Sequence, residues 1–97
     1  MEYLEKYNLT NEDIENIISN IDEQDILEIE YNQKRVEEII EYLLSIGIKD
    51  IKAILMYKTN IFYDDIDSIK RRVEEYNGID LIELINEDIV NFDLIGI

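Results

Sequence analysis

The spacing of the apolar residues is the strongest constraint in this sequence, because it matches one face of an α-helix. Residues 36–44 show it best, with apolar side chains at intervals of three, one, three and one: Val36, Ile39, Ile40, Leu43 and Leu44. In a helix these intervals place all five side chains on one side. Asn32 can cap such a helix, and Gly47 stands where helices commonly end. The segment therefore predicts a helix that starts at Gln33 and stops at Gly47.

The same spacing recurs along most of the chain. Apolar stripes occupy residues 14–21, 51–55, 66–76 and 81–89. Thr10 and Asp13 form a variant of the capping box, which marks the start of a helix. Strand-like alternation is confined to residues 26–31 and 61–63, which we interpret as turns or single helical turns. We predict an all-α fold, a small bundle of five or six helices.

Length and charge narrow the class of protein further. Ninety-seven residues correspond to one domain, since domains commonly have about 50–200 residues. Acidic residues number 24 and basic residues 9, which gives a net charge of −15. The hydrophobic fraction of 46% is sufficient for a core, so the chain is not a disordered acidic tail. All basic residues except Lys6 lie between residues 34 and 72, so two acidic ends flank a near-neutral centre.

Residue types that common catalytic devices need are absent. The sequence has no Cys and no His, which excludes disulfides, zinc–sulfur sites and nucleophiles activated by imidazole. No Ser stands in a Gly-x-Ser-x-Gly turn, and the Gly residues are too far apart for a phosphate-binding loop. We therefore predict a protein that is not an enzyme, with no catalytic residues, no cofactor and no metal.

No targeting or membrane-spanning segment is recognisable. Apolar runs fall short of the roughly 20 residues of a transmembrane helix. The acidic residues 1–5 lack the basic-then-apolar pattern of a signal peptide. We expect a cytoplasmic protein without a membrane partner. The abundance of Ile, Asn, Lys and Tyr, whose codons are AT-rich, favours a low-GC bacterium or its phage as the source.

An internal repeat emerges when the chain is shifted by 37 residues. Residues 13–18, Asp-Ile-x-x-Ile-Ile, then match residues 50–55, Asp-Ile-x-x-Ile-Leu. The basic-basic-Val-Glu-Glu segment at residues 34–38 matches residues 71–75 without a gap. A period of this length with two helices per unit is typical of helical-repeat proteins. We predict a single domain, residues 1–97, with units at about 10–47 and 48–78 and a partial unit at 79–97.

Each unit has a defined order of helices. A short helix that begins with Asp-Ile-x-x-Ile-Ile/Leu is followed by a middle segment and then by a longer helix with the pattern Val-x-x-Ile-Ile-x-x-Leu. The first unit ends at the junction formed by residues 43–48. This order resembles the repeat of the mitochondrial transcription termination factor (mTERF) family, most closely over residues 39–75 and loosely over 9–75. The resemblance implies a helical-repeat fold and nucleic-acid binding through a basic groove. The chain departs from the family in its acidic charge and at residues 59–62, where the family usually has a proline.

Acidic residues gather at equivalent places of the two units, in residues 22–30 and residues 64–67. Neither segment has the Asp-x-Asp-x-Asp-Gly order of a calcium loop, so we expect no metal there. Because the segments are equivalent, we expect both to face the same side and to bind a partner; the alternative is a solvated acidic surface. The predicted partner-binding residues are Asp22, Glu23, Asp25, Glu28, Glu30, Asp64, Asp65 and Asp67.

Basic residues offer an alternative, nucleic-acid-binding site. In this interpretation Lys49, Lys52 and Lys58 lie on one stripe with the residues that contact phosphates. These phosphate-binding candidates are Lys34, Arg35, Lys70, Arg71 and Arg72. In the competing interpretation Lys34 and Arg71 pair with the glutamates three and four residues later in the same helix. We favour the pairing, because the field of 24 carboxylates opposes the approach of nucleic acid.

Aromatic residues and the C-terminal segment are further candidates for contact. The central aromatic residues either form a contact surface or seal the edge of the core. They are Tyr31, Tyr42, Tyr57, Phe62, Tyr63 and Tyr76. The apolar residues 92–97 pack back onto the last helix, form an exposed apolar end, or offer a docking edge for another copy, which would give a homodimer; we favour packing back.

Together these observations predict an acidic protein-binding module. We expect its partner to be a protein with a basic, nucleic-acid-binding surface, which the module would occupy and inhibit in the manner of an anti-restriction, anti-CRISPR, antitoxin or immunity protein. An acidic face is steered onto a basic groove, and the attraction weakens with salt. Two alternatives stay open: a nucleic-acid-binding module of the mTERF type, and an adaptor or fragment of a larger helical-repeat protein.

Overall fold

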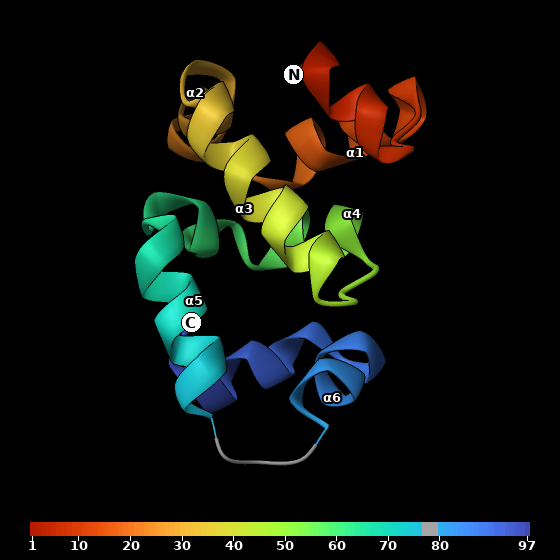
Figure 1. The fold of residues 1–97 in the computed structure, drawn as a ribbon. Helices are drawn as coiled ribbons and strands as arrows, with labels where there is room; N and C mark the ends of the chain where they lie inside the picture. The colour runs from red at the N-terminus through yellow and green to blue at the C-terminus, as the bar shows by residue number, and fades with distance from the viewer. Residues whose placement is uncertain (77–79) are drawn as a thin grey trace.

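The computed structural model describes residues 1–76 and 80–97 and is all α-helical, as predicted (Figure 1). These residues form six α-helices and three 3₁₀-helices, and none of them forms a β-strand. No helix in the described part is long and apolar enough to cross a membrane. In chain order the elements are η1 (Glu2–Tyr7), α1 (Asn11–Asn20), α2 (Glu23–Tyr31), α3 (Gln33–Ser45), α4 (Ile51–Tyr57), η2 (Thr59–Tyr63), α5 (Ile66–Glu75), α6 (Leu81–Glu87) and η3 (Ile89–Ile95).

Short polar side chains set the starts of several helices. The predicted capping box is confirmed: the Thr10 hydroxyl accepts the Asp13 N–H, and the Asp13 carboxylate accepts the Thr10 N–H, each at 3.0 Å. Asp22, Asp50 and Asp65 cap α2, α4 and α5, each accepting the N–H of the residue three positions later. Several acids of this chain therefore serve to begin helices, where the helix dipole also favours negative charge.

Helix α3 spans Gln33–Ser45 and ends as the sequence predicts. Gly47 follows with a φ of +100°, a conformation that side chains other than glycine rarely adopt. The N–H groups of Gly47 and Ile48 donate back to the carbonyls of Leu44 and Leu43, at 3.1 and 3.0 Å. This pair of hydrogen bonds is the Schellman arrangement, which satisfies carbonyls that would otherwise lack a partner.

Helix α2 differs from the prediction of turns or single helical turns for this part of the chain. Nine residues, Glu23–Tyr31, form a regular α-helix. Ile29 is fully buried and Ile26 is partly buried against the core, so packing against α3 and η2 stabilises a helix of marginal length. Asn32, predicted to cap α3, instead donates its side-chain amide to the Glu28 carbonyl at 3.3 Å.

The core extends along the inner side of α3, which contacts α2, α5 and η2. Four of the five residues of the predicted stripe are buried, whereas Leu44 is exposed at the end of the helix. Phe62 of η2 and Phe92 of η3 are the largest fully buried side chains. Helix α4 contacts α1, η2 and η3, and Figure 1 shows α2 and α6 at opposite ends of the molecule.

Element η3 packs back onto α6 and also contacts α4, so the arrangement that the sequence favoured for residues 92–97 is observed. The side chain of Asn86 in α6 donates to the Gly47 carbonyl and accepts the Lys49 N–H, both at 2.9 Å. One amide group therefore attaches α6 to the turn between α3 and α4.

The two copies of the sequence repeat occupy different positions within the helices. Residues 13–18 lie in α1 and residues 50–55 lie at the start of α4. Residues 34–38, however, begin α3, whereas residues 71–75 end α5. The helix boundaries therefore do not show the period of 37 residues found in the sequence. The predicted boundary between the second and third units falls in residues 77–79, outside the described residues.

Candidate functional site

The first predicted acidic segment lies in α2, which contacts η2. The Tyr63 hydroxyl, at the end of η2, donates a hydrogen bond of 2.6 Å to the Asp25 carboxylate in α2. Asp64 and Asp65 follow Tyr63 directly in the chain, so this bond ties the start of the second acidic segment to the first. We refer to the acidic residues of both segments next to this bond as the acidic junction; its members are Asp22, Asp25, Glu28, Asp64 and Asp65.

The acidic junction changes the ionisation of the Tyr63 phenol. Its hydrogen bond to Asp25, followed by partial desolvation and the negative charges of Asp25, Glu28 and Asp22, raises the pKa of Tyr63 to about 12. The phenol is therefore protonated near neutral pH and acts as a hydrogen-bond donor to the carboxylate. With 40% of its surface exposed, Tyr63 lies between the two acidic segments at the surface of the protein.

Most carboxylates of the acidic junction already hold the local fold together. Asp22 and Asp65 are the caps of α2 and α5. Asp64 accepts two hydrogen bonds from the start of α5, and Glu28 forms an ion pair of 3.1 Å with Arg35. Within the described residues no three carboxylates are grouped so as to hold a metal ion.

The other three predicted acids lie outside the acidic junction. Glu30 in α2 pairs with the amino group of Met1 at 2.6 Å. Glu23 and Asp67 are exposed, and neither makes a hydrogen bond or an ion pair with any residue that the structure describes. These two carboxylates can therefore be neutralised without breaking a contact of the fold.

Three of the five predicted basic residues make contacts within the protein. Arg72 is half-buried and donates from Nη1 to the Ile95 carbonyl at 3.0 Å, so its guanidinium supports the C-terminal segment. Lys70 lies over the ring of Tyr42, with Nζ 5.5 Å from the ring centre. Arg35 pairs with Glu28, so these three cations contact different parts of the protein.

The predicted pairing of bases within helices is not observed in the described residues. Lys34 and Arg71 make no ion pair there, and Glu37 accepts hydrogen bonds from Lys6 and Gln33. These two bonds hold the pKa of the Glu37 carboxyl below its usual range. Ion pairs instead join different elements: Lys6 with Glu37, Arg35 with Glu28, Lys52 with Asp13, and Lys58 with Asp93.

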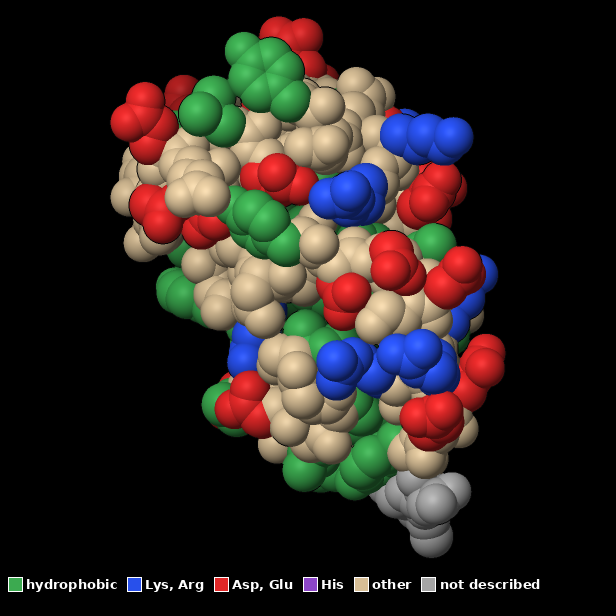
Figure 2. Space-filling view, turned by 90° about the vertical axis from the view of Figure 1, so that its left-hand side faces the viewer, with side chains coloured by type: hydrophobic (Ala, Val, Ile, Leu, Met, Phe, Trp, Pro, Cys, Tyr) green, Lys and Arg blue, Asp and Glu red, His purple; other side chains and the backbone are tan. Residues whose placement is uncertain are grey.

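Figure 2 shows the side of the molecule that carries α2 and α5. Acidic and basic side chains are mixed over the right-hand part of this view, whereas its upper left shows acidic side chains with no basic ones among them. The mixed part agrees with the ion pairs between elements.

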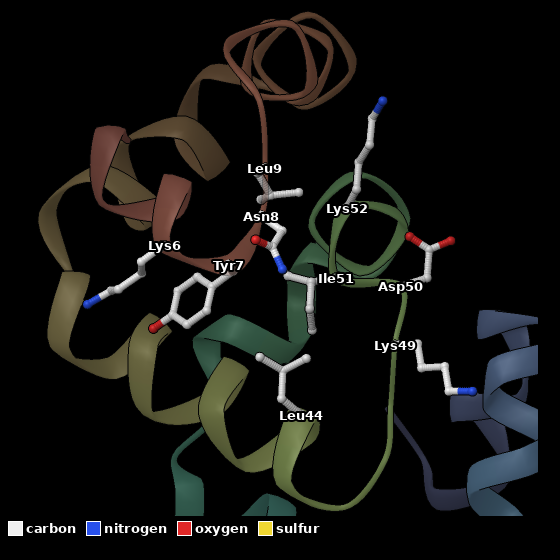
Figure 3. A pocket seen from close by; sticks show the side chains of 9 residues that line it. All are labelled: Lys6, Tyr7, Asn8, Leu9, Leu44, Lys49, Asp50, Ile51 and Lys52. Carbon is white, nitrogen blue, oxygen red and sulfur yellow. The ribbon is translucent and has the colours of Figure 1, made fainter.

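A pocket of about 350 Å³ lies between η1, α3 and α4 and was not predicted, because its lining comes from three separate segments. Leu44 and Ile51 give it apolar walls, and Lys6, Lys49 and Lys52 border it. Figure 3 shows that the three lysine side chains point in different directions, away from the pocket. The pocket therefore lacks the convergent positive charge that an anion site requires.

The outer side of α2 exposes two large apolar side chains. Leu27 is 48% exposed and Tyr31 is 78% exposed. Tyr31 is among the predicted contact residues, whereas Leu27 is not. The spacing of four residues between them would have revealed the pair if residues 23–31 had been recognised as a helix.

Comparison of the chain with protein-family models, with curated proteins and with solved structures finds no match. The resemblance to the mTERF repeat therefore stays a prediction from the sequence pattern.

Proposed function

We propose that this protein is a non-enzymatic acidic module that occupies the basic, nucleic-acid-binding surface of a cytoplasmic partner protein and inhibits it. The hydrogen bond between Tyr63 and Asp25 is the observation that carries the proposal, because it ties the start of the second acidic segment to the first. Carboxylates held at fixed positions can pair with the Lys and Arg side chains that otherwise contact phosphates.

The overall charge supports a basic partner. The chain has 24 acidic and 9 basic residues, so most carboxylates have no cation of the chain to neutralise them. A protein with this charge is steered towards a positively charged surface, and the association rate falls as ionic strength rises. We therefore expect the complex to form readily at low salt and to weaken as salt is added.

Nucleic-acid binding of the mTERF type is the alternative proposal. It requires basic side chains along one groove that follows the phosphate backbone. Arg72 instead bonds to Ile95, and Lys52 and Lys58 pair with acids of other elements. This dispersion favours a protein partner. We also propose a helical-repeat architecture, in which α1 and α4 are equivalent short helices. This proposal rests on the sequence repeat.

A pull-down from bacterial lysate at low salt, with matched charge variants, tests the proposed function. The test variant is Glu23→Gln with Asp67→Asn, and the control is Glu83→Gln with Glu87→Gln. Each removes two exposed negative charges, but the control acts on α6, at the opposite end of the molecule from α2. Retained proteins and nucleic acids are identified at increasing salt concentrations.

The expected result is a basic nucleic-acid-binding protein whose retention falls with salt and is reduced more by the test variant than by the control. Addition of the purified acidic protein should then displace nucleic acid from the recovered partner protein. Recovery of DNA or RNA without such a protein would refute the proposal and favour the mTERF-type alternative. Equal effects of the two variants would show that only total charge matters, which contradicts a role for the α2 and α5 segments.

A further inference from the structure

Helix α2 presents a short apolar ridge at the surface. Leu27 and Tyr31, 48% and 78% exposed, lie one helical turn apart. Ile29 is fully buried on the opposite side of the helix, so the two exposed side chains point away from the core. We refer to Leu27 and Tyr31 as the α2 ridge.

Carboxylates flank the α2 ridge on both sides. Helical spacing places Glu23 and Glu30 on one flank and Glu28 on the other, whereas Asp25 lies further round the helix, towards its buried side, and bonds to Tyr63. Glu28 pairs with the exposed Arg35, and a partly exposed pair of this kind contributes little to stability, so a basic side chain of a partner can replace Arg35 at small cost. Glu30 pairs with the amino group of the buried Met1, whereas Glu23 has no cationic partner among the described residues.

Other exposed apolar side chains have different surroundings. Val90 and Leu94 of η3 are 50% and 48% exposed, close to the values for the α2 ridge. Val90 lines a groove with Lys58 and Asp88, and Leu94 lines another with Arg72 and Glu75. A basic partner would meet charges of both signs at η3, whereas Glu23 beside the α2 ridge has no cationic partner in the part of the chain that the structure describes.

We infer that the α2 ridge is the apolar anchor of the binding face, and that it docks on a protein surface built to bind single-stranded nucleic acid. Such surfaces combine basic residues, which follow the phosphates, with exposed aromatic side chains on which bases stack. The flanking carboxylates can pair with the basic residues of such a surface, and Leu27 and Tyr31 can pack against its aromatic side chains. Contacts to duplex DNA go mainly to phosphate and sugar oxygens, so a duplex-binding surface offers less for an apolar ridge to contact. This inference rests on the proposed function and names the class of partner surface.

Two peptides of equal charge test the inference directly on the full chain. One alternates Arg with Trp and the other alternates Arg with Ser, so they differ only in the apolar platform. Fluorescence anisotropy gives the Kd of each peptide over a range of salt concentrations. The test variants are Tyr31→Ala alone and Leu27→Ala with Tyr31→Ala, and the control is Val90→Ala with Leu94→Ala. Circular dichroism establishes that each variant is folded.

The Arg–Trp peptide should bind on the order of tenfold more tightly than the Arg–Ser peptide. Both α2-ridge variants should reduce this preference without changing the Kd or the salt dependence of the Arg–Ser peptide, and the η3 control should retain it. Equal affinity for the two peptides, or equal loss in ridge and control variants, would refute the inference while leaving the proposed function intact. Failure of both peptides to bind at low salt would refute the proposed function itself, and the inference with it.

Discussion

Replacing Tyr63 by Phe removes the one hydroxyl that joins the two acidic segments. The lost hydrogen bond is 2.6 Å long and has a charged acceptor, Asp25; bonds of this kind contribute about 1.5–3 kcal/mol. Tyr63 is 40% exposed, so water can replace part of the interaction. We therefore expect Tyr63→Phe to reduce the free energy of unfolding by about 1 kcal/mol, which is less than the full effect of a charged hydrogen bond.

Urea unfolding followed by circular dichroism measures this loss. For a small domain whose m-value is about 1 kcal/mol per molar, a loss of about 1 kcal/mol lowers the midpoint by about 1 M. Tyr57→Phe is the control, because Tyr57 is 67% exposed and its hydroxyl makes no hydrogen bond with the described residues. A double-mutant cycle with Asp25→Ala isolates the interaction between the two side chains.

Equal midpoints for Tyr63→Phe and Tyr57→Phe would refute the reasoning, as would a cycle with no coupling between Tyr63 and Asp25. Either result would mean that packing of α2 against η2 alone holds the acidic junction together. The variant should also weaken binding of the Arg–Ser peptide if that hydrogen bond positions the carboxylates.

The remaining predictions concern pH, the core and two turns. The pKa of Tyr63 is about 12 in the folded protein, above its ordinary value of 10.0. The stabilisation by the Tyr63 hydroxyl is therefore complete below pH 10 and is lost as the pH rises towards 12. The urea midpoints of the wild type and of Tyr63→Phe should converge over this range. Phe62→Ala removes a fully buried ring and should cost about 3–5 kcal/mol, seen as a large fall in Tm; a small fall would contradict the assigned core. Gly47→Ala places a side chain at a φ of +100° and should cost about 1 kcal/mol or more, with the urea midpoint as readout and an unchanged midpoint as the contrary result. Asn86→Ala breaks two hydrogen bonds to backbone groups and should lower the free energy of unfolding by about 1–3 kcal/mol, whereas an unaltered value would show that water replaces both.

Features that depend on neighbouring residues were predictable from the sequence. The capping box of Thr10 and Asp13 and the helix stop at Gly47 involve partners within a few positions, so the local sequence contains the information that determines them. Helix α2 was missed because Ile26 and Ile29 alone face its core contacts, which is too few to produce a clear stripe. Its stability comes from α3 and η2, which the local pattern does not include.

Contacts between distant residues were predicted less well. The sequence suggested that Lys34 pairs within its helix, whereas Glu37 bonds to Lys6, which lies 31 positions away. The repeat predicted that the two acidic segments face the same side. The bond between Tyr63 and Asp25, which joins η2 to α2, is not encoded by the repeat, because residue 26, the position equivalent to Tyr63, is an isoleucine. Such pairings are set by how helices pack, and spacing within a helix gives no information about them.

The bridge formed by Asn86 has a consequence for how the protein opens and closes. Its two bonds join α6 to residues 37 and 39 positions earlier, so they form only after that long stretch of chain has been brought together. Helix α3 is surrounded by α2, α5 and η2, whereas α6 depends on this bridge and on its contact with η3. The backbone amide hydrogens of α6 should therefore exchange with solvent through partial opening of the fold. Those of α3 should exchange only through global unfolding. The C-terminal helices would then be the last part of the domain to assemble and the first to come apart.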